Sequence, residues 1–221
     1  MAIQLDVRPK IDIETRLFIG GEFVDSIEGG RCQVINPHDN TVLCEISEAG
    51  VKDVDRAVAA ARKAFPAWKR MPASERGRLL YKLADAIEAD REYLTRLETL
   101  DTGHPIRDTS NLDLPRTAAT FRYFAGMCDK IDGRVAPVEP GFLNYILREP
   151  LGVIGEIVPW NFPLMFVSWK LGPALAAGNT VVLKPSEWTP LTALRLAELA
   201  AGVLPEGVLN EIGRASCRER V

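Results

Sequence analysis

The stretch that decides the fold runs from Glu149 to Glu187 and reads EPLGVIGEIVPWNFPLMFVSWKLGPALAAGNTVVLKPSE. Its first part, Gly152 to Val158, is a short apolar run of the kind that forms buried parallel strands. The apolar segment from Leu164 to Ala177 predicts a helix, and the β-branched run from Thr180 to Leu183 predicts a second strand. Strand, helix and strand in this order predict a parallel sheet that binds ligands beyond the carboxyl ends of its strands.

Polar side chains follow both expected strands. Pro159 and Pro163 bracket a rigid loop that displays Asn161, and Lys184 stands at the end of the second strand. An asparagine amide held in this way can donate to a developing oxyanion with little reorganisation. The commoner arrangement, an asparagine that bonds to its own loop backbone, is the alternative that spacing alone leaves open.

Three motifs in this stretch, PWNFP, WKLGPALAAGN and KPSE, resemble the aldehyde dehydrogenase superfamily in order and spacing. These enzymes use NAD(P) to oxidise aldehydes to carboxylic acids. The resemblance extends from about Leu17 to Asn210 and covers less than half of the family's usual chain. It implies an α/β fold: a partial Rossmann-like cofactor domain with N-terminal helices and a β-hairpin oligomerisation arm. The chain has no GxGxxG, and the family's variant of the Rossmann arrangement does not require one.

The resemblance also assigns roles to individual residues. Asn161 is the expected catalytic oxyanion donor. The expected cofactor-binding residues are Ile157, Pro159, Trp160, Lys184, Ser186 and Glu187. The expected aldehyde pocket contains Phe162, Phe166 and Trp169, although periodicity alone would equally place these aromatic side chains in the core.

The expected cofactor is NAD. A Lys184 ammonium can bond to ribose hydroxyls, and a Glu187 carboxylate can accept from the same ribose. Glu187 would also repel the 2′-phosphate of NADP, while Ser186 and Lys184 together leave NADP open. The alternative is an ordinary solvated Lys–Glu pair on a loop.

Composition excludes several other classes of function. A net charge of −3 gives no basic footprint for nucleic acid or anionic lipid. No run reaches the roughly 18 apolar residues of a membrane span, and the charged N-terminus does not resemble a signal peptide. The four cysteines and two histidines lack metal-ligand spacing, so no metal site is expected. Reduced thiols in the cytoplasm are the simplest interpretation.

The chain divides into four expected segments. Residues 1–130 hold an N-terminal arm, short strands and the helices of the cofactor domain; 131–151 form the β-hairpin arm; 152–210 form the strand–helix–strand unit; and 211–221 form a tail outside the family pattern. By resemblance, the arm pairs with a neighbouring subunit to form a homo-oligomer, and an ordinary surface hairpin is the alternative.

Helical periodicity is clear between the first strands and the arm. An apolar stripe that begins at Val51 predicts a first helix, and Ser74 is the expected cap of a second. Asp90 is the expected cap of a third, which stops before Gly103, and a fourth should run from about Leu114 to Lys130. Near the end of the chain, Thr189 is the expected cap of a helix that begins at Pro190.

The tail EIGRASCRERV is charged where a strand should follow Leu209, and it is interpreted as a truncation scar, a frameshift or a cloning-derived segment. Cys217 within it lacks the setting of the family's nucleophile. The expected function is therefore that of an N-terminal fragment of an aldehyde dehydrogenase, inactive alone because the family's cysteine nucleophile and glutamate base are missing. Two alternatives stay open: a non-catalytic nucleotide-binding or assembly module, and an acyl-group reductase of the same superfamily.

Overall fold

The computed structural model describes residues 12–215, and most of the N-terminal arm and Cys217 lie outside that range. The fold is α/β, as expected. Its main sheet has the strand order β2-β1-β9-β8-β7, with β7, β8 and β9 parallel and β1 antiparallel to both of its neighbours. These strands are β1 (Leu17–Ile19), β2 (Glu22–Val24), β7 (Val153–Ile157), β8 (Thr180–Lys184) and β9 (Leu209–Glu211).

Two smaller sheets stand beside the main one. A three-stranded sheet has the order β10-β4-β3, and a two-stranded hairpin pairs β5 with β6. Their strands are β3 (Gly30–Ile35), β4 (Val42–Ala49), β10 (Arg214–Ala215), β5 (Arg134–Ala136) and β6 (Asn144–Ile146).

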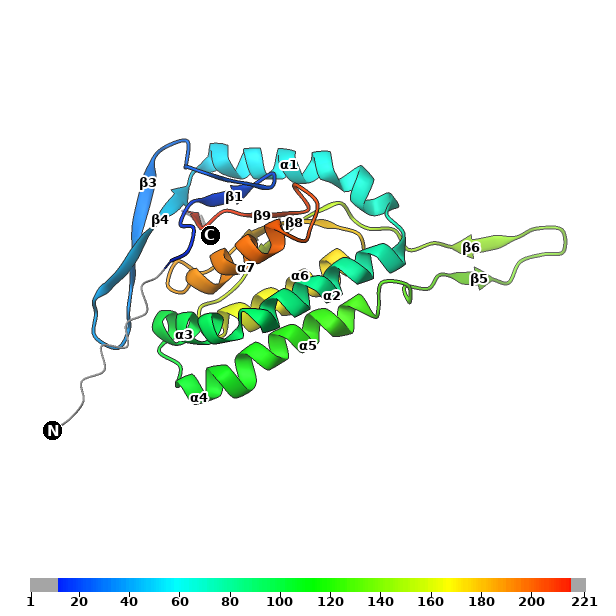
Figure 1. Ribbon diagram of the computed structural model, residues 1–221. Coiled ribbons are helices and arrows are strands. Elements are labelled where there is room, and N and C mark those ends of the chain that lie inside the picture. Colours follow the sequence, from blue (N-terminus) through cyan, green and yellow to red (C-terminus); the bar gives the residue numbers. More distant parts are fainter. Residues whose placement is uncertain (1–11, 216–221) are drawn as a thin grey trace.

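Helices cover both faces of the main sheet (Figure 1). One face carries α1 (Val51–Arg70); the other carries α6 (Pro163–Ala176) and α7 (Leu191–Ala201). A further helical layer packs outside α6 and α7 and consists of α2 (Ala73–Ala89), α3 (Arg91–Thr102), α4 (Ile106–Asp108), η1 (Thr109–Asp113) and α5 (Leu114–Ala125). The largest cluster of buried apolar side chains lies between this layer and the sheet. No described helix is long and apolar enough to cross a membrane.

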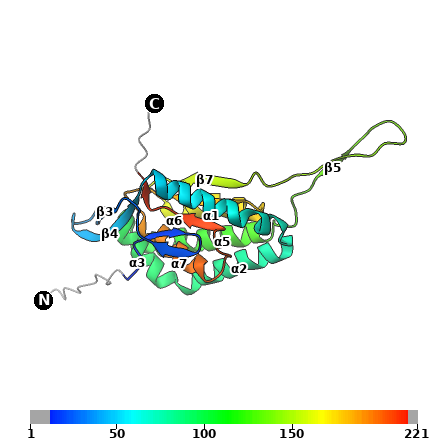
Figure 2. The same cartoon turned by 90° about the horizontal axis from the view of Figure 1, so that it is seen from above.

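The expectation that a charged tail replaces the strand after Leu209 is wrong for the first residue of that tail. A strand does follow: β9 reaches Glu211, pairs with β8 on one side and β1 on the other, and its residues are buried. The sheet edge that the sequence predicts beside β8 is therefore closed. Among the three parallel strands, β7 is the one at an edge of the sheet, and Figure 2 shows it at the rim of the body. Its last residue, Ile157, is 65% exposed.

Two helix starts differ from the sequence expectation. Ser74 lies inside the first turn of α2, whose N-cap is Pro72. Asp90 stands at the N-cap of α3 as expected, but its carboxylate binds the guanidinium of Arg195 at 2.7 Å and caps no backbone group. A cationic partner from α7 therefore competes successfully with the local capping rule.

The first and fourth helices also differ in detail. Val51 begins α1 but is 75% exposed, because the buried face of this helix is offset from the expected stripe. The fourth helix, α5, ends at Ala125, short of Lys130. The third stops as expected: Gly103 takes a left-handed conformation with φ of 77°.

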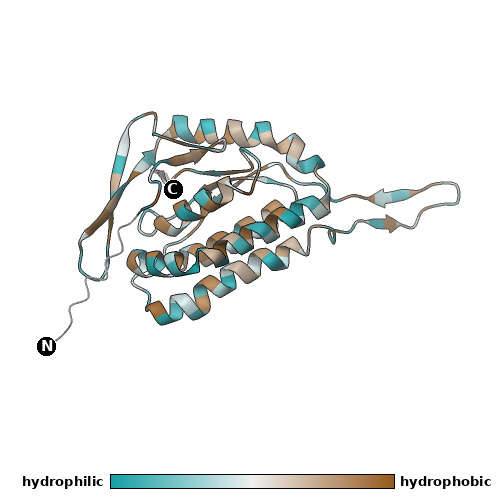
Figure 3. Cartoon of the chain, viewed as in Figure 1, coloured by the Kyte–Doolittle hydropathy of each residue, from teal (hydrophilic) through white to brown (hydrophobic). Residues whose placement is uncertain are grey.

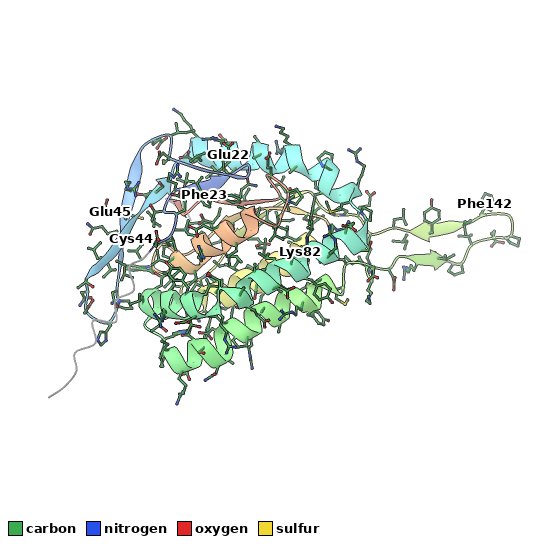
Figure 4. All side chains as sticks on the ribbon, viewed as in Figure 1. Glu22, Phe23, Cys44, Glu45, Lys82 and Phe142 are labelled. Atoms are coloured by element: carbon green, nitrogen blue, oxygen red, sulfur yellow. The ribbon has the colours of Figure 1, made fainter. Side chains whose placement is uncertain are left out.

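The hairpin expected within 131–151 is formed and stands clear of the body (Figure 1). Part of the hairpin consists of apolar residues, and no other described segment covers them (Figure 3). Phe142 lies at its tip and is 77% exposed, and Leu143 is 74% exposed (Figure 4). The arm leaves the body at the end of the sheet where β7 begins, opposite the carboxyl ends of the parallel strands.

Candidate functional site

Alternate residues of β7 and β8 face opposite sides of the sheet, and this alternation divides the expected site residues into two sets. Val182 packs with α1, whereas Val181 and Leu183 belong to the cluster with α6 and α7. Ile157 is the register partner of Lys184 at the carboxyl ends of the two strands. Both line the cavity on the α1 side, so two of the expected cofactor-binding residues are neighbours.

This α1-side cavity has a volume of about 360 Å³. Apolar side chains of α1, β7 and β8 form most of its wall, and Lys184 and Arg62 supply positive charge. The residues that line it are Val54, Val58, Arg62, Val153, Gly155, Glu156, Ile157, Val182, Lys184 and Ile212. An apolar cleft with a few cationic donors suits a flat polar ligand that carries phosphate groups.

Lys184 is buried, with only 8% of the residue exposed. Its ammonium donates to the carbonyl of Pro185 at 3.2 Å and lies 3.5 Å from the carboxylate of Glu187. The pair therefore exists, but Lys184 is not the solvated residue of the alternative interpretation. Glu187 lies in the β8–α7 loop (residues 185–190) and is exposed.

Ser186 shapes the same β8–α7 loop. Its hydroxyl oxygen accepts a hydrogen bond from the backbone N–H of Trp188 at 3.2 Å. Thr189 does not cap α7, contrary to the sequence expectation: its hydroxyl donates to the carbonyl of Trp160 at 3.1 Å. The N-cap of α7 is Pro190. The sequence expectation made Pro190 the first helical residue instead. The bond from Thr189 ties the β8–α7 loop to the β7–α6 loop (residues 158–162).

The β7–α6 loop carries Pro159, Trp160 and Asn161. Pro159 and Trp160 are exposed, and Asn161 is half-buried. The side-chain amide of Asn161 makes no hydrogen bond to any residue between 12 and 215. The alternative in which Asn161 bonds to its own loop backbone is therefore not what the structure shows, and the amide is available to a ligand.

The expected pocket aromatics separate. Phe166 and Trp169 pack edge to face with ring centroids 5.2 Å apart. Phe162 instead packs against His104, with ring centroids 5.0 Å apart. His104 Nδ1 in turn lies 3.0 Å from the buried carboxyl of Asp113. Trp169 also lines an open groove of about 610 Å³ with Arg116, Ala119, Thr120, Tyr123 and Phe124 of α5. No pattern in the sequence indicates this contribution of α5.

Two buried acids of α3 were also missed. Burial raises the pKa of Glu98 to about 7, although a hydrogen bond from Thr192 lowers it. Burial likewise raises the pKa of Asp101 well above its usual value. A signal was present in the sequence, because both acids fall on the same helical stripe as Leu94 and Leu97. An acid on an apolar stripe predicts a buried, hydrogen-bonded carboxyl.

Glu156 is a buried acid near the carboxyl end of β7. Burial raises its pKa to about 8, against the lowering effect of Lys170. It faces a cavity of about 420 Å³ along the free edge of β7, between β7 and α6.

No described cysteine is an activated nucleophile. Burial raises the pKa of Cys44 to about 12 and also raises that of Cys128. Cys32, Cys44 and Cys128 form no disulfide, and they lie outside the elements of the strand-end site. Between residues 12 and 215 no cluster of three His, Cys, Asp or Glu side chains could hold a metal ion.

A family model described as "Aldehyde dehydrogenase family" matches residues 23–217, beyond Asn210 where the motif resemblance ends. Human aldehyde dehydrogenase 1A1 is 50% identical over 201 residues, which are 89% of this chain and 40% of that protein. The rat mitochondrial aldehyde dehydrogenase is 48% identical over 200 residues, 88% of this chain and 38% of that protein. This chain thus spans about 40% of the length of the curated relatives that it matches.

Solved structures agree. PnpE from Pseudomonas in complex with nicotinamide adenine dinucleotide is 59% identical with a TM-score of 0.90, and the likeness covers 91% of this chain and 42% of PnpE. The NAD+ complex of an aldehyde dehydrogenase from Bacillus cereus is 44% identical with a TM-score of 0.90, covering 97% of this chain and 44% of that one.

Proposed function

Because this chain belongs to the aldehyde dehydrogenase family, we propose that it is the cofactor-binding part of an NAD-dependent enzyme that oxidises an aldehyde to a carboxylic acid. The observation that carries the proposal is the Asn161 amide, which is held between two prolines and has no partner among residues 12–215. Support also comes from the relatives whose solved structures contain this cofactor.

The residues present fit NAD. The buried Lys184 stands 3.5 Å from Glu187 at the end of β8, so a donor and an acceptor lie close together where a pair of ribose hydroxyls can contact both. Ile157 and the valines of α1 offer an apolar wall in the same cavity. NAD, when bound, supplies the acceptor for the aldehyde's hydride.

The chain's own contribution to chemistry is the oxyanion donor. As a nucleophile adds to the aldehyde, negative charge develops on the carbonyl oxygen, and the Asn161 amide can donate to it without first giving up another hydrogen bond. The attacking thiolate is not found among residues 12–215, because burial keeps Cys44 and Cys128 protonated. Phe162, Phe166 and Trp169 would form the apolar side of the path to Asn161.

Assembly and compartment follow from other features. We propose that the hairpin arm pairs with a second subunit, because its apolar tip residues are exposed in the single chain. The absence of a disulfide at Cys32, Cys44 and Cys128 supports a reducing compartment such as the cytoplasm.

The test is a chimera in which residues 1–210 are followed by the C-terminal part of PnpE. We expect the chimera to form NADH from NAD and an aldehyde. Asn161→Ala should lower turnover about 10²–10³-fold, the usual effect of losing one oxyanion donor, and leave the Kd for NAD unchanged. A folded chimera without aldehyde-dependent NADH formation would favour the non-catalytic module. An Asn161→Ala variant with normal turnover would restrict this residue to a role in its loop.

A further inference from the structure

Two buried carboxyls of α3 contact the first turn of α7. The carboxylate of Asp101 accepts a hydrogen bond from the backbone N–H of Leu191 at 2.8 Å. That of Glu98 accepts one from the hydroxyl of Thr192 at 2.6 Å. Leu191 is the first residue of α7, and the β8–α7 loop runs directly into it. The two acids therefore hold the point at which this loop ends.

A second link carries this constraint to the other loop. Thr189, two residues before α7, donates to the carbonyl of Trp160, the residue that precedes Asn161. A displacement of the first turn of α7 would therefore move Thr189 and, with it, the support of the β7–α6 loop. The expected ribose-binding residues and the expected oxyanion donor share this anchor.

The two acids are costly groups to bury. Glu98 and Asp101 are 0% and 2% exposed, and one carboxyl oxygen of Asp101 has no hydrogen-bond partner among residues 12–215. An apolar pair would join α3 to α7 at lower cost, but it would lack direction. A hydrogen bond to a specific N–H or O–H fixes the rotation and height of the first turn of α7, which apolar packing does not.

We propose that Glu98 and Asp101 are positioning residues, which fix the first turn of α7 and through it the relative placement of the β8–α7 and β7–α6 loops. The consequence of this positioning role for NAD binding rests on the proposed function. The loop geometry itself can be tested without any ligand.

The first test uses the isolated chain, with Trp188 as the reporter. Trp188 lies in the β8–α7 loop and is 69% exposed. After Trp160→Phe and Trp169→Phe, the remaining tryptophans are Trp188 and Trp68. Trp68 is buried in α1 and serves as a rigid internal reference. In this background, Asp101→Ala should at least double the amplitude of the fast component of the fluorescence anisotropy decay. Asp101→Asn, which retains an acceptor oxygen for the N–H of Leu191, should restore it.

Two further variants guard against a general loss of structure. Asp53→Ala removes another buried carboxyl, which accepts from the backbone N–H of Gly50 at the start of α1, and it should leave the signal of Trp188 unchanged. Thr192→Val removes the donor to Glu98 without opening a cavity, so it should raise the fast component even if Asp101→Ala fails to fold. Equal signals in Asp53→Ala, Asp101→Ala and Thr192→Val would overturn the proposal.

The second test uses the chimera and NAD. Loss of a helix cap costs about 1 kcal/mol, so Asp101→Ala should weaken NAD binding about five- to tenfold, with recovery in Asp101→Asn. Lys184→Ala is measured beside it. If Lys184→Ala weakens NAD binding and Asp101→Ala does not, the positioning role is wrong. If neither weakens it, the cofactor assignment fails, and the anisotropy result alone decides on the loop geometry.

Discussion

At the scale of single residues, the carboxyl of Glu211 shows how burial couples stability to pH. Glu211 is fully buried in β9, where one oxygen accepts from the N–H of Gly213 and the other has no partner among residues 12–215. Burial raises its pKa to about 8 from the ordinary value of 4.5. Because the folded pKa is the higher one, its contribution to stability is full below pH 4.5 and is lost as the pH rises through 8.

We therefore expect Glu211→Gln to flatten the pH dependence of unfolding. Between pH 4.5 and 8, the free energy of unfolding of the wild-type chain should fall, relative to the variant, by up to about 1.4 kcal/mol per pH unit. The difference between the two proteins isolates Glu211 from Glu98, Asp101 and Glu156, whose raised pKa values act in the same direction. Urea unfolding at pH 5, 6.5 and 8 measures it. Glu22→Gln, on exposed β2 in the same sheet (Figure 4), is the control; a constant difference across pH would contradict the prediction.

Lys184 and Glu187 allow a prediction about the cofactor. In the chimera, Lys184→Ala should weaken NAD binding by about 1–3 kcal/mol, the range for charge-assisted hydrogen bonds. Glu187→Gln should narrow the preference for NAD over NADP, because it removes the repulsion of the 2′-phosphate. Titration of both cofactors against the three proteins measures these changes. Lys82→Ala removes the same charge from α2 (Figure 4) and should have no effect. Unchanged affinities in the Lys184 and Glu187 variants would refute the ribose assignment.

At the scale of elements, local sequence rules succeed where an element depends on its own residues. The stop of α3 at Gly103 and the strand–helix–strand unit from 153 to 184 were predictable because a left-handed glycine and apolar periodicity are local properties. Asp90 and Thr189 were assigned as caps but have distant partners, Arg195 and Trp160, which no local pattern reveals.

The strand β9 was missed for a related reason. The charged segment EIGRASCRERV after Asn210 indicates a tail outside the sheet, yet pairing with β8 and β1 buries its first residue, Glu211. Among site residues, the neighbours Ile157 and Lys184 followed from the motifs. The walls supplied by α1 and α5 did not, because they come from helices far away in the sequence.

The hairpin arm supports a prediction at this scale. In the chimera, Phe142→Ser combined with Leu143→Ser should shift the protein to a smaller assembly, because apolar residues at an exposed tip need a partner. Sedimentation velocity measures the change. Val51→Ser alters another exposed apolar side chain, at the start of α1, and should leave the assembly intact. An unchanged mass in the arm variant would support the alternative of an ordinary surface hairpin.

At the scale of the whole molecule, we expect the isolated chain not to oxidise aldehydes. Cys44 and Cys128 are protonated near neutral pH and Cys32 is buried, so none of these three described cysteines is placed to add to an aldehyde. NADH formation with a panel of aldehydes measures this directly. Aldehyde-dependent NADH production that disappears in Cys217→Ser would show that the nucleophile is present after all.

The isolated chain should also associate through its free sheet edge, although at β7 and not beside β8 as the sequence indicated. Unpaired backbone groups of β7 lie next to Leu151, which is 91% exposed. Leu151→Lys should therefore reduce association, since a charge beside a strand edge opposes pairing. Light scattering over a concentration series measures the effect. A monomeric wild-type chain that melts cooperatively would contradict the expectation.

The alternation of side chains along β7 has a consequence for insertions and deletions. Val153 packs with the cluster beneath α1 and its neighbour Ile154 packs with the cluster that includes α6, so this strand separates two compartments. One residue added before Gly155 would turn every following side chain to the opposite face, placing Glu156 against α1 and Ile157 against α6. Two added residues would restore both. The strand is therefore sensitive to the parity of a length change: an odd change exchanges the contents of the compartments, and an even change leaves each side chain on its own side.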